Sequence, residues 1–161
     1  MIDMAMLGEA QTRRDLAQLL YTAVELSGRN RCEIARDAEM HKDALRRTLA
    51  GERSPSVGEA LRILASADMA PHAQLLLFLG AGGDLTTRWL QTDIAQFFEE
   101  FIGELPGALE RVLGNQVHDV KPRWAKGTAH RVARLLADHI DELERKDALL
   151  GEALGVGGRH G

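Results

Sequence analysis

The sequence has little of what a disulfide-bonded, secreted or membrane-spanning protein needs. Its 161 residues include one cysteine, Cys32, which excludes an internal disulfide and favours a reducing compartment. No apolar run approaches the roughly 20 residues of a membrane-spanning helix. The first residues lack the charged lead, apolar run and small-residue cleavage site of a secretory signal. We therefore expect a soluble, cytoplasmic protein that does not enter a membrane.

Strand patterning is also missing. No segment alternates apolar and polar residues with period two, whereas a period of 3.6 residues recurs along the chain, which predicts an all-α fold. Aromatic residues are few, and of the seven only Tyr21 precedes Phe78. Composition changes at the glycine-rich stretch 80–84, so we expect three parts: residues 1–80, a helical region 81–150, and a flexible tail 151–161.

The net charge of the chain excludes a protein whose whole surface is positively charged. The formal net charge is -4, so any contact with nucleic acid must rest on a local patch. Residues 29–53 hold seven Lys/Arg against five Asp/Glu, residues 84–110 hold one against six, and residues 117–134 hold five against one. Two segments of an acidic chain are therefore locally cationic.

The first part is predicted to contain five helices, over residues 12–27, 31–38, 41–50, 56–67 and 71–79. Their inward residues are expected to be Leu16, Leu19, Leu20, Ala23, Leu26, Ile34, Ala35, Leu45, Leu49, Leu61, Ile63 and Leu64. Gly28 and Gly51 are typical helix ends. The tetrapeptide from Ser56 to Glu59 predicts a capping box, and Pro71 suits a first helical turn.

The second part is predicted to hold a strongly amphipathic helix over residues 85–105, broken by Pro106. A short helix over 107–113, a loop over 114–122 and a long helix from 123 or 128 to 150 should follow. The long helix carries an apolar stripe of Val132, Leu136, Ile140, Leu143 and Leu150.

The stretch "GRNRCEIARDAEMHKDALRRTLAGERSPSVGEALRILASADM", residues 28–69, has the layout of a helix-turn-helix. It resembles the DNA-binding domain of the lambda-repressor/Cro-like (XRE) family over about residues 12–79. The resemblance rests on Ile34, Ala35 and Ala38, on Leu45, Leu49, Gly51 and Pro55, and on "EALRILA". Membership would imply a five-helix domain that binds double-stranded DNA.

Residue spacing on the second motif helix predicts which side chains face outward. If Leu45 and Leu49 anchor the helix on the core, its charged residues point away from it. The resemblance implies that these residues read bases in the major groove and that others hold phosphates. The expected base contacts are Lys42, Asp43, Arg46 and Arg47, and the expected phosphate contacts are Arg31, Arg36, Arg53 and His41.

The sequence departs from the family pattern in two places. Glu39 replaces the turn glycine, and His41 replaces the usual serine cap of the second motif helix. Because a non-glycine residue at positive φ is uncommon, the turn is either strained or slightly different in geometry.

A single small DNA-binding domain makes few contacts, and members of this family commonly bind as two-fold dimers. We expect residues 85–150 to mediate homodimerisation through Phe97, Phe98, Phe101, Leu136, Ile140 and Leu143. The alternative is that these faces pack against each other within one chain. The cationic stretch 121–131 around Trp124 either binds phosphate or pairs with the acidic stretch 84–110, and we favour the pairing.

No pattern indicates catalysis, a cofactor or a metal. The stretch "LLLFLGAGGDLTTRWL" lacks the third glycine and the parallel sheet of a dinucleotide site. His118, His130 and His139 are spaced too irregularly to share a helical face. We therefore expect a protein that is not an enzyme, and the resemblance to the XRE family implies a sequence-specific, dimeric transcriptional regulator. By the habit of this family alone, a repressor is expected rather than an activator. Two alternatives remain: an antitoxin whose C-terminal half binds a partner protein, and a helical scaffold that never contacts DNA.

Overall fold

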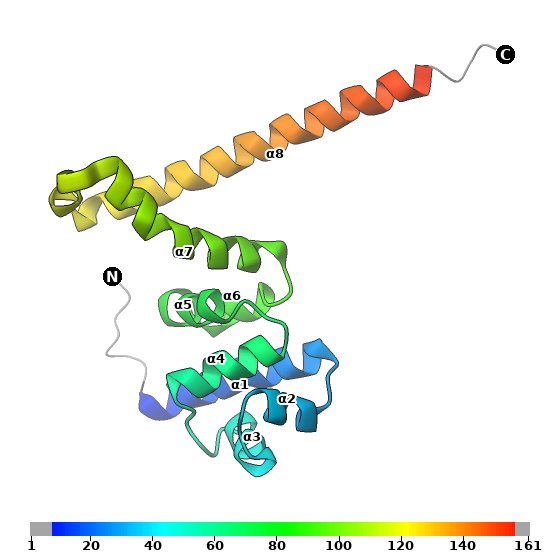
Figure 1. The fold of residues 1–161 in the computed structure, drawn as a ribbon, viewed down its shortest axis with the longest axis vertical. Coiled ribbons are helices and arrows are strands. Elements are labelled where there is room, and N and C mark those ends of the chain that lie inside the picture. The colour runs from blue at the N-terminus through cyan, green and yellow to red at the C-terminus, as the bar shows by residue number, and fades with distance from the viewer. Residues whose placement is uncertain (1–7, 157–161) are drawn as a thin grey trace. The chain divides into compact units, whose positions relative to one another are not determined.

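The computed structural model describes the backbone of residues 8–156 and the side chains of residues 8–151. Over this range the chain is all-helical and contains no strand, as the sequence predicted. The elements are α1 (Glu9–Ser27), α2 (Arg31–Asp37), α3 (Lys42–Leu49), α4 (Val57–Ser66), α5 (Pro71–Ala81), α6 (Gly83–Arg88), α7 (Asp93–Leu113), η2 (Gly114–Asp119), η3 (Pro122–Trp124) and α8 (Ala125–Val156) (Figure 1).

The chain divides into two compact units, Met1–Ala108 and Leu109–Gly161, and we call the first of these the head. The division falls 28 residues after the boundary expected at residue 80. The reason is that α6 packs against both α1 and α5, and Leu90, which follows it, is buried in the core of the head. The glycine-rich stretch 80–84 is thus a turn inside one unit rather than a linker.

The core of the head is formed mainly by α1 to α4. Its fully buried side chains include Leu19 and Leu20 on α1, Ile34 on α2, Leu45 on α3, and Ile63 and Leu64 on α4. The prediction that Leu26 belongs to the core is wrong: Leu26 is 47% exposed, and Val24 is buried instead. The helix ends at Ser27, so the stripe continues from Leu20 to Val24 and does not reach Leu26.

The helix ends in the head follow the predicted capping chemistry. Gly28 adopts the left-handed conformation with φ of 66°, and Gly51 has φ of 74°. Ser56 and Glu59 form both hydrogen bonds of a capping box, with Ser56 Oγ accepting from the Glu59 amide at 3.1 Å. Pro71 lies in the first turn of α5, as expected. These caps fix where α1, α3, α4 and α5 begin or end.

Residues 85–105 do not form the single helix that was predicted. The chain ends α6 at Arg88 and starts α7 at Asp93, because the Trp89 and Leu90 amides bond back to Thr86 and Thr87 and close the first helix. Glu99 then ties α7 to α5: its Oε2 accepts from the Ala73 amide at 2.6 Å, at the otherwise unpaired start of α5.

The helix break predicted at Pro106 is also wrong, since α7 continues through Pro106 to Leu113. Proline removes its own amide from the helix ladder, which leaves the Ile102 carbonyl without that donor, and the residues around Pro106, from 103 to 107, are exposed.

The second unit contains the last turn of α7, η2, η3 and α8. The predicted loop 114–122 forms short 3-10 turns, and α8 starts at Ala125. The helix runs to Val156, into the segment that was predicted as a tail; residues 157–161 of that segment lie outside the described range. Among the described helices, none is both long and apolar enough to cross a membrane.

Candidate nucleic-acid interface

Helices α2 and α3 form a helix-turn-helix whose turn keeps the left-handed geometry expected of a glycine. Glu39 has φ of 55°, so the strained alternative is the one found. The turn is held by the Met40 amide, which donates to the Ala35 carbonyl at 2.9 Å, and Met40 itself packs against the core. A glutamate at positive φ persists here because the surrounding contacts fix the backbone.

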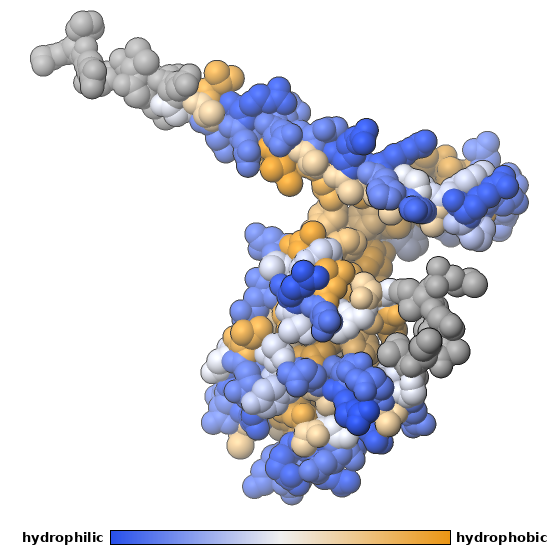
Figure 2. All heavy atoms as spheres, turned by 180° about the vertical axis from the view of Figure 1, so that it is seen from behind, coloured by the Kyte–Doolittle hydropathy of each residue, from blue (hydrophilic) through white to orange (hydrophobic). Residues whose placement is uncertain are grey.

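Helix α3 divides its residues sharply between core and solvent. Leu45, Thr48 and Leu49 are buried, with Leu45 only 1% exposed. The four predicted base-contact residues, Lys42, Asp43, Arg46 and Arg47, all lie on the exposed side. Helices α2 and α3 form one end of the head in Figure 1, and the same end is mainly hydrophilic in Figure 2. The predicted anchoring by Leu45 and Leu49 is therefore confirmed.

His41 supplies the cap that the family's serine would provide. Its Nδ1 accepts a hydrogen bond from the Asp43 amide at 3.2 Å, and its side chain stays largely exposed. The sequence placed His41 at this cap position, but a capping bond was not expected from it because histidine is not a common capping residue. The cap leaves the other ring nitrogen, Nε2, available at the start of α3.

The exposed arginines of α3 make only long, solvent-exposed ion pairs. Arg46 Nη1 and Arg47 Nε each lie 3.9 Å from Glu52 Oε2, and all three side chains are more than half exposed. In the described chain Lys42 has no ion pair, and Asp43 lies 3.7 Å from His41. Exposed pairs at such distances contribute at most about 1 kcal/mol, so a phosphate or base edge can replace them.

The two predicted phosphate contacts on α2, Arg31 and Arg36, each pair with a neighbouring acidic residue and remain partly exposed. Arg31 Nη2 donates to Glu25 Oε1 at 2.5 Å, and its guanidinium lies 5.5 Å from the centre of the Tyr21 ring. The hydrogen bond to Glu25 raises the pKa of Arg31. Arg36 is 73% exposed and lies 3.2 Å from Asp37. Both arginines keep surface available, and Arg31 would have to leave Glu25 or bind through its remaining donors.

Arg53 is less exposed than Arg31 and Arg36 and is held by two hydrogen bonds within the head. Its Nη2 donates to Glu59 Oε1 at 2.7 Å and its Nη1 to Thr48 Oγ1 at 3.2 Å, and only 33% of the side chain is exposed. The hydrogen bond from Arg53, followed by that from the Ser56 amide, lowers the pKa of Glu59. Arg53 therefore braces the loop between α3 and α4, and its contact with phosphate stays a prediction.

Two further arginines have bracing roles that sequence reasoning missed. Arg62 Nε donates to the Ala38 carbonyl at 2.8 Å, at the end of α2, and Arg29 joins Asp37 at 2.6 Å and the Ser66 carbonyl at 2.5 Å. The hydrogen bond from Arg29 lowers the pKa of Asp37. No local pattern reveals these bonds, because the partners are up to 37 residues away in sequence.

Four of the eight predicted contact residues, Arg31, Lys42, Asp43 and Arg46, meet at one shallow hollow. It has a volume of about 230 Å³ and is lined by Arg31, Cys32, Lys42, Asp43, Leu45 and Arg46, from the first turns of α2 and α3. Arg31, Lys42 and Arg46 outnumber the single carboxylate of Asp43 around the hollow, and this excess of positive charge favours an anion there. Arg36, His41, Arg47 and Arg53 do not line this hollow.

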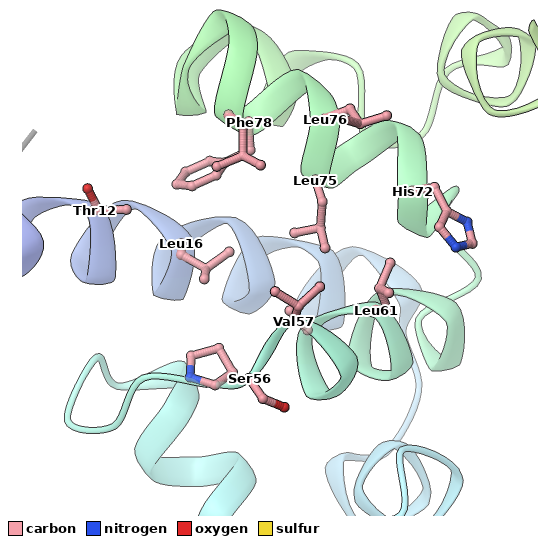
Figure 3. Close-up of a pocket in the computed structure, with 12 residues that line it drawn as sticks. Thr12, Leu16, Ser56, Val57, Leu61, His72, Leu75, Leu76 and Phe78 are labelled. Atoms are coloured by element: carbon pink, nitrogen blue, oxygen red, sulfur yellow. The ribbon is translucent and has the colours of Figure 1, made fainter. Parts of the chain in front are cut away.

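A second hollow of the head contains none of the predicted contact residues. It lies between α1, α4 and α5, has a volume of about 390 Å³, and is lined chiefly by apolar side chains such as Leu16, Val57, Leu75 and Phe78 (Figure 3). Its composition suits an apolar group rather than a phosphate. It is therefore not part of the candidate interface.

The predicted dimerisation residues fall into two groups. In the head, Phe98 stacks on Trp89 and packs against Ala70, Ala73 and Ala95, so it contributes to an internal core of the head. Phe97 and Phe101 stack on each other at 5.6 Å and are half-buried. In the second unit, Leu136 is half-buried, whereas Ile140 and Leu143 are exposed on α8.

The cationic stretch in the second unit surrounds an exposed tryptophan. Trp124 is 49% exposed, and Arg123 and Arg131 join it around a hollow of about 450 Å³ at the start of α8. Whether this stretch binds phosphate or pairs with acidic residues stays a prediction. Across the described residues, no group of three or more His, Cys, Asp or Glu side chains could hold a metal ion.

Comparisons of the chain with protein-family models, with curated proteins and with solved structures give no match.

Proposed function

We propose that the protein is a sequence-specific DNA-binding transcriptional regulator of the lambda-repressor/Cro type, non-enzymatic and acting as a homodimer on an operator with two half-sites. The observation that carries the proposal is the division of α3. Its buried Leu45, Thr48 and Leu49 fix the helix on the core, and this fixed backbone displays Lys42, Asp43, Arg46 and Arg47 together. A helix held in this way can be inserted into a major groove as a rigid body.

Local charge supports binding to a polyanion, and the residue types on α3 suit the base edges of duplex DNA. Although the chain is acidic overall, the exposed side of α3 carries three cations and one carboxylate, and Arg31 lies beside it at the hollow between the helix starts. Arg and Lys donate to the guanine O6 and N7 acceptors, and Asp43 can accept from a cytosine amino group. Guanidinium groups on α2 at the flank of α3 suit the adjoining phosphates.

The distinction between base and phosphate contacts gives the first test. Arg46→Ala should relax sequence preference at one position by about 5- to 150-fold, since a good base contact contributes about 1–3 kcal/mol of discrimination. Arg31→Ala should instead weaken all duplexes alike and reduce the salt slope by about 1. The measurement is selection from a random duplex library, followed by binding titrations at several salt concentrations.

Arg14→Ala on α1 is the matched control, because it removes an exposed guanidinium from the head outside α2 and α3. It should leave the selected sequence unchanged. If Arg46→Ala selected the same sequence as the unaltered protein, the role given to Arg46 would be incorrect. Failure to retain any duplex at low salt would favour the helical scaffold, and copurification of a small partner protein would favour the antitoxin.

A further inference from the structure

Helix α8 carries a seven-residue apolar repeat that the fold of its own unit does not use. Leu136, Leu143 and Leu150 are spaced by seven, and Ala133, Ile140 and Asp147 form a second series three residues ahead of them. In heptad terms the leucines occupy d positions and the second series occupies a positions. A strict seven-residue repeat on one helix is the pattern that produces a left-handed coiled coil.

The repeat is largely uncovered in the structure. Ile140 is 54%, Leu143 is 46% and Leu150 is 61% exposed, and the hydrophobic residues are visible among hydrophilic ones along α8 in Figure 2. Within the second unit, α8 packs chiefly against the short η3 at its start, where Thr128 Oγ1 donates to the Trp124 carbonyl at 3.0 Å. The apolar series begins after this contact and needs another helix to cover it.

We propose that a second copy of α8 covers this series, forming a parallel, in-register, two-stranded coiled coil; the inference rests on the proposed homodimer and specifies its interface. In this register each large apolar residue meets its own copy, giving three leucine layers at d and one isoleucine layer at a. Isoleucine at a with leucine at d is the combination that favours two parallel strands.

The flanking residues agree with the parallel register. In a parallel coil each g residue faces the e residue of the other helix that lies five positions later in sequence. His139 at a g position therefore faces Glu144 of the second copy. The other two g-to-e pairs join Val132 to alanine and Lys146 to glycine. The interface therefore contains one pair on each side that can form a hydrogen bond and no pair of like charges at these positions.

Asp147 separates the parallel from the antiparallel arrangement. In the parallel coil the two Asp147 carboxylates share one layer next to the last leucine layer, where their like charges repel and weaken the pair. In the antiparallel coil that aligns Ile140 with Leu143, each Asp147 would lie against Leu136 of the other copy, giving two layers in which a carboxylate is buried against leucine. The parallel coil therefore confines the mismatch to one layer near the end of the apolar series and leaves every leucine facing leucine.

A parallel coil also has the connectivity that a two-half-site regulator needs. Each head precedes its α8 in the chain, so both heads join the coil at the same end. Recognition helices must be about 34 Å apart to bind adjacent half-sites, and an antiparallel coil would attach the heads at opposite ends of a 32-residue helix.

The interface is tested first by the mass of the full-length protein in sedimentation equilibrium. Leu143→Glu should weaken dimerisation by at least about 100-fold, because it buries a charge in a central layer. Leu135→Glu is the control: Leu135 is 69% exposed and lies one residue before a d position, outside the seam. Circular dichroism checks that both variants remain folded. An unaltered protein that is monomeric, or a Leu143→Glu variant that stays dimeric, would overturn the proposal.

Orientation is tested by cross-linking in a Cys32→Ser background, which removes the exposed native cysteine. Leu150→Cys alone should give a covalent dimer under mild oxidation, since the two residues face each other only in the parallel register. If Leu150→Cys alone gives none while Ala133→Cys combined with Leu150→Cys does, the coil is antiparallel and the proposal is wrong. Neither experiment includes DNA, so a parallel dimer that binds no duplex would refute only the proposed function.

Discussion

Helices α3 and α8 are both amphipathic, and they differ in which face the molecule buries. The eight residues of α3 are too few to form a stable helix alone, so its leucines are packed into the head and its cations are displayed. The 32 residues of α8 form a helix whose leucines remain exposed. Each helix exposes the face that it does not bury, a charged face in α3 and a largely apolar stripe in α8.

The contrast predicts different costs for the same truncation. Leu45→Ala on α3 should destabilise the head by about 2–5 kcal/mol, because it leaves a cavity in a site that is 1% exposed. Leu149→Ala on α8, where the side chain is 66% exposed and outside the seam, should cost less than about 0.5 kcal/mol. Urea unfolding of the full chain measures both, and equal losses would contradict the distinction between the two helices.

A second prediction separates bracing arginines from displayed ones. Arg53→Ala should destabilise the head by about 1–3 kcal/mol, since Glu59, whose side chain is 17% exposed, loses a charged hydrogen-bond donor. Arg47→Ala on the displayed face should change stability by less than about 0.5 kcal/mol. Comparable losses of unfolding free energy in the two variants would show that Arg53 contributes no more to the stability of the head than Arg47 does.

The same ion pair gives the head a pH dependence. Because the pKa of Glu59 is lowered in the fold, its ionised form stabilises the head fully above its unfolded pKa of about 4.3. That stability is lost as the pH falls through the lowered pKa. Glu59→Gln should therefore show a shallower loss of stability on acidification, and Glu104→Gln at an exposed position should not. A slope unchanged by Glu59→Gln would contradict the role of the pair.

Much of the fold could be predicted because its signals are local. Gly28, Gly51 and the Ser56 to Glu59 box determine helix ends through their own backbone and side-chain chemistry, and Leu45 and Leu49 follow the helical period. The outward direction of the α3 charges follows from the same two leucines. What these charges bind remains a prediction, since the geometry of a surface is compatible with more than one partner.

The errors arise where distant residues decide. The burial of Leu90 in the core of the head and the packing of α6 against α1 join segments that are far apart in sequence. Pro106 lies in an exposed part of a continuous helix, which the sequence does not show. Arg53 pairs with a glutamate six residues on, and Arg62 with a carbonyl 24 residues back, so a cationic residue in this segment can brace the fold as readily as it can meet a phosphate.

The smallest expected effect concerns the turn that holds α3 in place. Glu39→Gly should stabilise the head by about 0.5–1 kcal/mol. Glycine removes a left-handed backbone strain of about 1–2 kcal/mol, but it also raises the conformational entropy of the unfolded chain, which offsets part of this gain. Glu33→Gly, six residues earlier and inside α2, should instead destabilise it by about 0.5–1 kcal/mol. Thermal unfolding distinguishes the two signs. A loss of stability in both variants would mean that the glutamate at position 39 makes a favourable contact that outweighs its backbone strain, and that the turn depends on this side chain.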